Sequence, residues 1–261
     1  MNSKQRIIIV HNTASHYPLM RDNSYYFMHL GVKHPNKLFI SSPQKTMINF
    51  YNISDRDNQE YYEAIEVYKA GTPEELQLKP EDLDKKMDSG NAIIILGKQN
   101  IMPAFMAMLW KLEGTDFIIN EIISIIPSFK DVPFSKMYFD VLKHSEYYQS
   151  HHILFEVEDP DFGDKTERIQ KLEHYFSHSF QLIQGVKTVV PSPIDESYEN
   201  TLLMLLTQDR FHQFSKTKIS QLLIKIYSDL YDTEKDTYLM KGLLEHIPET
   251  VELSGKWVPT Q

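Results

Sequence analysis

The stretch FIINEIISIIPSFKDVPFSKMYFDVL, residues 117–142, decides how this chain folds. Its first part, up to Ile126, is rich in isoleucine with few polar residues, a pattern typical of a strand with both faces covered. A Pro-Ser pair ends that strand, and apolar residues return at helical spacing between Ser135 and Leu142. Where a strand feeds a helix through a tight loop, the first amide groups of the helix can hold an anion. The stretch therefore predicts a buried strand, an amphipathic helix and, between them, the natural place for a phosphate-bearing cofactor.

The composition of the chain narrows the class of protein. Its 261 residues are 41% hydrophobic and 12% aromatic, which is enough for a sizeable core and argues against global disorder. The net charge is −9, and no run of Lys and Arg is longer than a pair, which disfavours a nucleic-acid partner. The chain has no cysteine, so disulfides, thiolate metal sites and cysteine nucleophiles are excluded.

The apolar stretches of the chain are short. None is long enough to span a bilayer, and the run RIIIV at 6–10 is too short for the core of a signal peptide. We therefore expect no membrane contact and a cytoplasmic location, which the lack of cysteine also fits. The sequence leaves the oligomeric state open and is compatible with a homodimer.

The patterns around the opening stretch predict an α/β fold with a mixed sheet. The breaks at 97–100 and 113–115 are short enough for hairpins, so the strands that they join should be antiparallel neighbours. A helix at 135–148 then crosses over to His152–Val157, which makes that strand parallel to 117–126. The expected strands are 47–53, 92–96, 102–112, 117–126, 152–157, 180–183, 187–190 and 201–207, and the expected helices are 58–70, 80–87, 135–148, 165–177, 215–231 and 236–246.

The chain also predicts three parts in order. Residues 1–45 form an N-terminal extension or flap, with strand candidates at 6–10 and 37–40. Residues 46–207 form the main domain, and residues 208–261 form a C-terminal helical extension. The N-terminal part carries aromatic residues that could pack on the sheet or mark a partner surface, namely Tyr17, Tyr25, Tyr26 and Phe27.

The order strand, two helices, three antiparallel strands, helix, strand, helix and two strands resembles the GNAT superfamily of N-acetyltransferases over about residues 46–207. EIISIIP at 121–127 resembles the central strand of that family, and ILFEVEDP at 153–160 is similar to the next strand in one bacterial branch. GTPEE at 71–75 and KLEHY at 171–175, with Phe180 after it, resemble further motifs of that branch. The resemblance implies a mostly antiparallel twisted sheet with a central parallel strand pair, flanked by helices. It also implies acetyl-CoA as co-substrate, bound where strands 117–126 and 152–157 diverge.

The coenzyme loop departs from the pattern of the family, which is R/Q-x-x-G-x-G/A. The aligned residues are KDVPFS at 130–135, so the basic residue remains as Lys130, while Pro133 and Ser135 stand where the glycines would be. Glycines let pyrophosphate lie against bare amide groups, and a proline removes one of those donors. On this resemblance the residues that bind the coenzyme are Ile125, Lys130, Val132, Phe134, Ser135 and Lys136.

The resemblance also assigns two catalytic roles. Glu121 would be the general base, and burial in an apolar strand would raise its pKa toward neutrality; the alternative is that Glu121 pairs with a neighbour or faces solvent. Tyr175 would protonate the leaving thiolate; the alternative is a packed aromatic residue. His174 and His178 have metal-compatible spacing, but no third ligand is indicated and we expect no metal.

Two functions therefore remain open. One is acyl-CoA-dependent N-acetyl transfer to a small amine or amino group, with a small-molecule amine as the acceptor. The other is a catalytically inactive GNAT-like module for binding, regulation or interaction with a protein partner, which the substituted loop favours. Fold alone does not choose between them, because one scaffold hosts many functions.

Overall fold

The computed structural model describes residues 6–10, for which only the backbone is placed, and residues 47–191, 197–208, 213–234 and 237–258. The strand expected at 37–40 and the aromatic residues expected to pack at 17–27 lie outside these ranges. Within them, no helix is both long and apolar enough to cross a bilayer.

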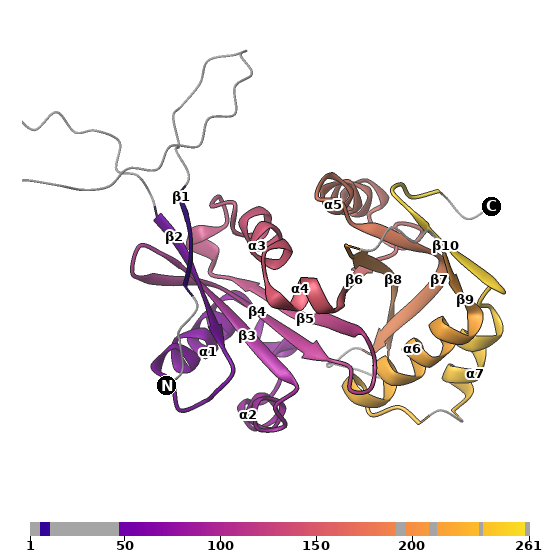
Figure 1. Cartoon of the computed structure of the whole chain (residues 1–261), viewed down its shortest axis with the longest axis horizontal. Coiled ribbons are helices and arrows are strands. Elements are labelled where there is room, and N and C mark those ends of the chain that lie inside the picture. The colour runs from indigo at the N-terminus through magenta and orange to yellow at the C-terminus, as the bar shows by residue number, and fades with distance from the viewer. Residues whose placement is uncertain (1–5, 11–46, 192–196, 209–212, 235–236, 259–261) are drawn as a thin grey trace, which may run out of the picture.

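The secondary structure follows the predicted order from residue 47 onward (Figure 1). The strands are β1 Arg6–Val10, β2 Met47–Ile53, β3 Ala92–Gln99, β4 Met102–Lys111, β5 Phe117–Ile125, β6 His152–Glu158, β7 Gln181–Pro191, β8 Tyr198–Leu206, β9 Gln213–Ser215 and β10 Thr250–Ser254. The α-helices are α1 Gln59–Gly71, α2 Pro80–Asp88, α3 Phe134–Lys143, α4 Glu146–Ser150, α5 Lys165–Ser177, α6 Lys216–Leu230 and α7 Tyr238–Glu245, with single 3-10 turns η1 at Glu74–Leu76 and η2 at Pro127–Phe129.

The strands form one ten-stranded sheet in the order β1-β2-β3-β4-β5-β6-β8-β7-β10-β9. Every neighbouring pair is antiparallel except β5 and β6, which are parallel. The predicted mixed sheet with one central parallel pair is therefore confirmed. The connection from β5 to β6 runs through α3 and α4, as a crossover between parallel strands requires.

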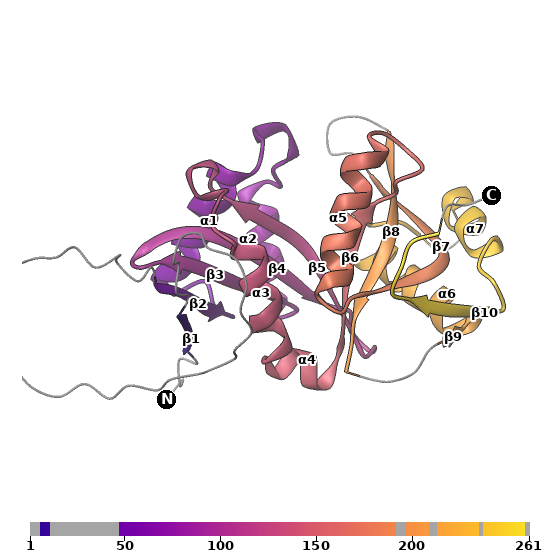
Figure 2. The same ribbon diagram turned by 90° about the horizontal axis from the view of Figure 1, so that it is seen from above.

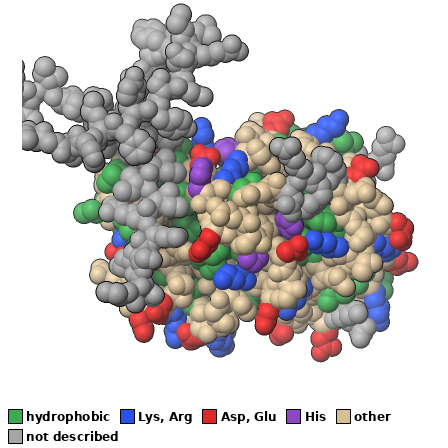
Figure 3. All heavy atoms as spheres, viewed as in Figure 1, with side chains coloured by type: hydrophobic (Ala, Val, Ile, Leu, Met, Phe, Trp, Pro, Cys, Tyr) green, Lys and Arg blue, Asp and Glu red, His purple; other side chains and the backbone are tan. Residues whose placement is uncertain are grey.

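Helices cover both faces of the sheet and enclose two cores (Figure 1). Helices α3 and α5 lie above the sheet in that view, and α2, α6 and α7 lie below it. In strand β4, Met106 and Met108 enter one core while Phe105 and Ala107 enter the other. Because both faces of the strand are buried, its sequence is a continuous apolar run. On the surface shown in Figure 3, Lys and Arg side chains are interspersed with Asp and Glu side chains.

Three features differ from the predicted elements. The single helix expected at 135–148 is broken into α3 and α4, because Ser145 accepts a hydrogen bond from the amide of Tyr148 and caps a new helix. The strands expected at 180–183 and 187–190 are one strand, β7, whose register on β8 shifts between Leu182 and Lys187. The C-terminal residues contribute β9 and β10 as well as two helices, and β10 pairs with β7.

Candidate functional site

The two parallel strands at the centre of the sheet separate after a short common course. Pairing joins Phe117–Asn120 of β5 to His152–Phe155 of β6. Beyond these residues the two strands continue to Ile125 and Glu158 without pairing to each other. A bulge on β5 accompanies the separation, because Met108 opposes Ile122 and Leu109 opposes Asn120, which leaves Glu121 as the extra residue. A bulge bends its strand and increases the local twist, so it accounts for a gap that opens from this point.

A cleft of about 560 Å³ lies at this divergence. Helix α3 lies over the half of the sheet that ends with β5, and α5 lies over the half that begins with β6 (Figure 2). The cleft is therefore lined from four elements, by Ile123 of β5, Ser135 and Phe139 of α3, Glu156 of β6 and Tyr175 of α5, among others. Strand ends that converge with helix termini on one cavity are a common setting for a ligand.

The loop between β5 and α3 leaves a few backbone donors unused. The amides of Phe129, Val132 and Phe134 bond to carbonyl groups within the loop, at 2.8, 3.0 and 2.7 Å. For the amides of Ser135 and Lys136, no residue in the described part of the chain accepts a hydrogen bond. These two consecutive N–H groups open a ten-residue helix, where the helix dipole also favours negative charge. The loop can therefore still meet a phosphate group, although Pro133 contributes no donor.

The other residues expected to bind the coenzyme lie around this loop. Lys130 and Lys136 are exposed, so their charges are available to an anion at the helix terminus. Ile125 and Val132 are partly buried and pack against the core on the α3 side of the sheet. Neither of them is among the residues that line the cleft.

Phe134 takes a different position from the one expected. Its side chain is fully buried and stacks on Phe105, with ring centroids 5.7 Å apart, and also contacts Phe50. Its amide is already bonded to the carbonyl oxygen of Val132. Phe134 therefore offers neither its side chain nor its amide to a coenzyme, and it anchors α3 on the sheet instead of filling the cleft.

Comparisons with known proteins bear on the fold. No protein-family model matches the sequence, and no curated protein sequence matches it. Among solved structures, a Bacteroides thetaiotaomicron protein described as an acetyltransferase of the GNAT family matches 71% of this chain and 99% of its own, at 19% identity and a TM-score of 0.55. The chain has the GNAT fold. The Escherichia coli ribosomal-protein-S18-alanine N-acetyltransferase matches 61% of this chain and 93% of its own, at 13% identity and a TM-score of 0.45. An aminoglycoside 6'-N-acetyltransferase complexed with coenzyme A matches 60% and 96%, at 13% identity and a TM-score of 0.44.

Tyr175 of this GNAT fold lines the cleft from α5. Its ring packs against Phe139, Phe155 and Phe180, with centroids 5.4, 5.7 and 5.1 Å away. Burial, and then the negative charge of Glu158, raise the pKa of Tyr175 to about 12. The hydroxyl therefore keeps its proton at neutral pH and can donate it.

Glu121 lies on the opposite face of the sheet from α3. Its carboxylate forms an ion pair with Lys86 of α2 at 2.8 Å, and both side chains are about 15% exposed. Burial raises the pKa of Glu121, while the charge of Lys86 and the hydrogen bond from it act in the opposite direction. The GNAT fold therefore places Glu121 at the divergence, but with one oxygen held by a lysine; the other, Oε2, has no hydrogen-bond partner in the described ranges.

A second carboxylate faces the same side from β6. Glu156 follows Phe155, which belongs to the α3-side core, so its side chain points to the face of Glu121. The hydroxyl of Tyr231, the residue that ends α6, donates a hydrogen bond to Glu156 Oε2. Glu156 Oε1 is buried and has no hydrogen-bond partner among the described side chains.

The environment of Glu156 changes its proton affinity. Burial raises the pKa of its carboxyl to about 7; the hydrogen bond from Tyr231 lowers it, and the negative charge of Glu121 raises it. The sequence analysis assigned catalytic roles to Glu121 and Tyr175 and none to Glu156. Nothing in the sequence pointed to Tyr231, which lies 75 positions away and belongs to the C-terminal helices.

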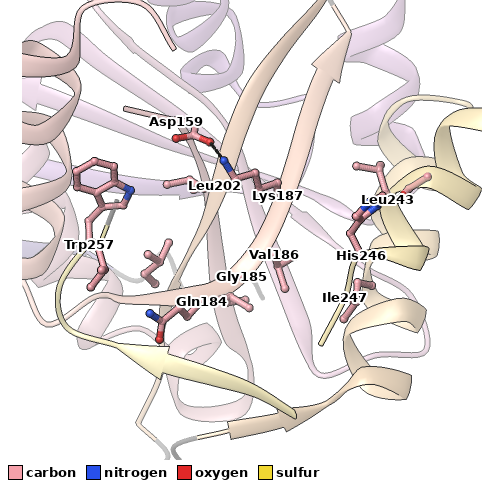
Figure 4. Close-up of a pocket in the computed structure, with 14 residues that line it drawn as sticks. Asp159, Gln184, Gly185, Val186, Lys187, Leu202, Leu243, His246, Ile247 and Trp257 are labelled. Atoms are coloured by element: carbon pink, nitrogen blue, oxygen red, sulfur yellow. Dashed lines mark hydrogen bonds and ion pairs between the residues drawn. The ribbon is translucent and has the colours of Figure 1, made fainter. Parts of the chain in front are cut away.

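A larger cavity of about 750 Å³ lies elsewhere, between β7, α7 and the segment around Trp257 (Figure 4). Figure 4 shows Trp257 on one side, His246 and Leu243 on the other, and the ion pair of Lys187 with Asp159 between them, at 3.0 Å. The residues that line this cavity include none from β5 or α3. The cleft at the strand divergence is the candidate site, because it joins unused helix amides, a protonated phenol and the buried carboxylate of Glu156.

Of the two histidines at metal-compatible spacing, His174 lines the cleft and His178 is not among its lining residues. The rings of His174 and His178 are adjacent, with centroids 4.6 Å apart. In the described ranges, no group of three or more His, Asp or Glu residues is arranged to hold a metal ion.

Proposed function

We propose that this protein transfers an acetyl group from acetyl-CoA to the amino group of a small amine. The observation that carries the proposal is the cleft at the β5–β6 divergence, which has the α3 amides on one wall and Tyr175 on another. The match to a GNAT-family structure supports the same reading at the level of the fold.

In this proposal the residues in and around the cleft have three roles: binding the coenzyme, protonating the leaving sulfur and deprotonating the acceptor. The amides of Ser135 and Lys136 bind the pyrophosphate of the coenzyme, and the charges of Lys130 and Lys136 favour the anion. This leaves the thioester near the divergence, where Tyr175 donates a proton to the departing sulfur. A carboxylate on the opposite face takes a proton from the acceptor ammonium group, and Glu121 is the residue that the sequence predicts for this role.

The test is a thermal-unfolding titration with acetyl-CoA, followed by an assay of released thiol. A ligand at one hundred times its dissociation constant adds about 2.7 kcal/mol to the free energy of unfolding. For a chain of this size that amounts to a rise in Tm of roughly 5–10 °C. Thiol release that depends on an added amine completes the test. No change in Tm at millimolar acetyl-CoA would remove the proposal.

A second candidate is a GNAT-like binding or interaction module without catalysis. The loop residues favour it, because Pro133 lacks a donor and the exposed carboxylate of Asp131 lies next to the anion position. Two unit charges about 6 Å apart at an effective dielectric constant of about 20 repel by roughly 3 kcal/mol. Acetyl-CoA binding without thiol release across primary amines, polyamines and amino-terminal peptides would favour this candidate.

A further inference from the structure

The C-terminal helix α6 contributes a residue to the candidate site. Helix α6 packs on the sheet through a buried stripe and ends at Leu230, with Tyr231 as the capping residue. The cap is well defined, because the amide of Thr233 bonds to the carbonyl oxygen of Tyr227 at 2.9 Å and Thr233 Oγ1 bonds to that of Tyr231 at 3.1 Å. The position of the Tyr231 ring is therefore set by the way the helix ends.

Neighbouring contacts hold the Tyr231 ring in place. Its ring lies against Tyr227, with centroids 5.5 Å apart. The hydroxyl of Tyr227 is itself bonded to the backbone of Val189 in β7, accepting from N–H at 2.8 Å and donating to the carbonyl oxygen at 2.7 Å. Thus Tyr227 ties α6 to the sheet, and Tyr231 extends from that fixed point to the carboxylate of Glu156.

The two oxygens of the Glu156 carboxylate therefore differ, because one accepts a hydrogen bond and the other does not. Tyr231 occupies Glu156 Oε2, while Oε1 has no hydrogen-bond partner in the described ranges and the residue lines the cleft. Glu121 also has one oxygen without a partner in the described ranges, but its charge is offset by the ion pair with Lys86. A buried carboxylate oxygen without a partner is costly, so a site that retains one is suited to a group that donates to it.

We propose that Tyr231 is a positioning residue of the acyl-transfer site, which holds Glu156 so that the second oxygen of Glu156, in place of Glu121, takes a proton from the acceptor ammonium group. The inference rests on the proposed acetyl transfer and deepens it, because it makes the C-terminal helices part of the site. The ammonium group gives one proton to Glu156, and the nitrogen then attacks the thioester carbon. The C–N bond forms, the C–S bond breaks, and one of the two protons left on the nitrogen passes through Tyr175 to the sulfur, while the other stays on the amide. Glu156 returns its proton to water.

The groups that face Glu156 set the pH at which it accepts a proton. They are Glu121 of β5, whose own charge is offset by Lys86 of α2, and Tyr231 and Tyr227 of α6. Among the residues that the structure describes, only Tyr231 donates a hydrogen bond to the carboxylate, and this bond favours the ionised form of Glu156. Loss of that bond should therefore raise the pH at which Glu156 ionises. A hydrogen bond to a charged group corresponds to about one to two pH units.

The test compares Tyr231→Phe with Tyr227→Phe, which removes a hydroxyl from the same helix but not from Glu156. We expect Tyr231→Phe to move the acidic limb of the kcat/KM profile upward by about one to two pH units, with activity recovered at high pH. Tyr227→Phe keeps the ring that packs on Tyr231 and loses the bonds to Val189, so it should lower stability and leave that limb in place. An equal loss of activity at every pH in Tyr231→Phe would mean a merely structural role and would overturn the proposal.

A second measurement does not depend on turnover. The ¹³C signal of the Glu156 carboxyl, assigned from its disappearance in Glu156→Gln, reports ionisation directly in the full-length wild type and in Tyr231→Phe. An upward shift of its titration in Tyr231→Phe is expected, and coincident titrations would overturn the inference. If the wild type releases no thiol but the titration of Glu156 is still shifted in Tyr231→Phe, acetyl transfer is refuted. The inference that Tyr231 controls the ionisation of Glu156 would then still hold.

Discussion

Glu156→Gln should change how the stability of this protein depends on pH. Burial raises the pKa of the Glu156 carboxyl from 4.5 to about 7, so the folded chain binds its proton more tightly than the unfolded chain. A group of this kind makes the free energy of unfolding fall as pH rises between its unfolded and folded pKa values. The window is therefore about pH 4.5 to 7, and the contribution is constant above it.

The size of the effect follows from the shift. A difference of about 2.5 pKa units corresponds to roughly 3 kcal/mol at 1.36 kcal/mol per unit. Glutamine has nearly the same shape as the protonated acid but carries no charge at any pH. The stability of Glu156→Gln relative to wild type should therefore increase by roughly 3 kcal/mol between pH 4.5 and pH 8.

Urea unfolding followed by circular dichroism at several pH values between 4.5 and 8 measures this difference. Glu173→Gln, on the exposed side of α5, removes the same charge at the surface and should give a profile parallel to that of wild type. If the Glu156→Gln and wild-type profiles also stay parallel within about 0.5 kcal/mol, the burial argument for Glu156 is refuted.

Two further predictions concern the loop and the strand end beside the cleft. Ser135→Asp places a negative charge in the first turn of α3 and should raise Tm slightly through its interaction with the helix dipole. The same charge should repel the pyrophosphate and weaken acetyl-CoA binding on the order of a hundredfold, which isothermal titration calorimetry measures. Thr217→Asp, at the matching position of α6, should give the same stability gain with unchanged binding, and equal binding by both variants would contradict an anion site at α3. Gly71→Ala places a Cβ about 2.7 Å from the backbone oxygen of Ile125, so it should cost about 1–3 kcal/mol in urea unfolding. Gly255→Ala, which meets no atom within 4 Å, should cost almost nothing, and similar losses for both would disprove the close approach of α1 to β5.

Much of the fold could be predicted because its signals are local. The isoleucine-rich run at 117–126 indicated a strand covered on both faces, and Ile118 and Ile119 do enter opposite cores. Short breaks between β3, β4 and β5 indicated hairpins, and the long connection through α3 indicated the parallel partner β6. The break between α3 and α4 was missed because apolar spacing continues through it, and the Ser145 cap is a weaker signal than that periodicity.

The candidate site was harder to predict, since its members come from distant segments. Ser135 and Tyr175 were assigned to the site by the resemblance to the GNAT family, and both line the cleft. The orientation of Phe134 could not be predicted, because a phenylalanine at the start of a helix can face the cleft or the sheet, and packing on Phe105 selects the sheet. The hydrogen-bond partner of Glu156 also could not be predicted, since no local sequence pattern relates Glu156 to Tyr231.

By itself the sequence determined the hairpins that join β3, β4 and β5, the parallel central pair and the loss of glycines from the anion loop, because periodicity and turn chemistry act over a few neighbouring residues. Only the tertiary structure decided where β5 and β6 part and which carboxylate oxygens lack a partner. The physical reason is the bulge at Glu121, which one extra residue creates and which resets the faces of every later side chain on β5. A contact such as that of Tyr231 with Glu156 forms only when the sheet and α6 are packed together.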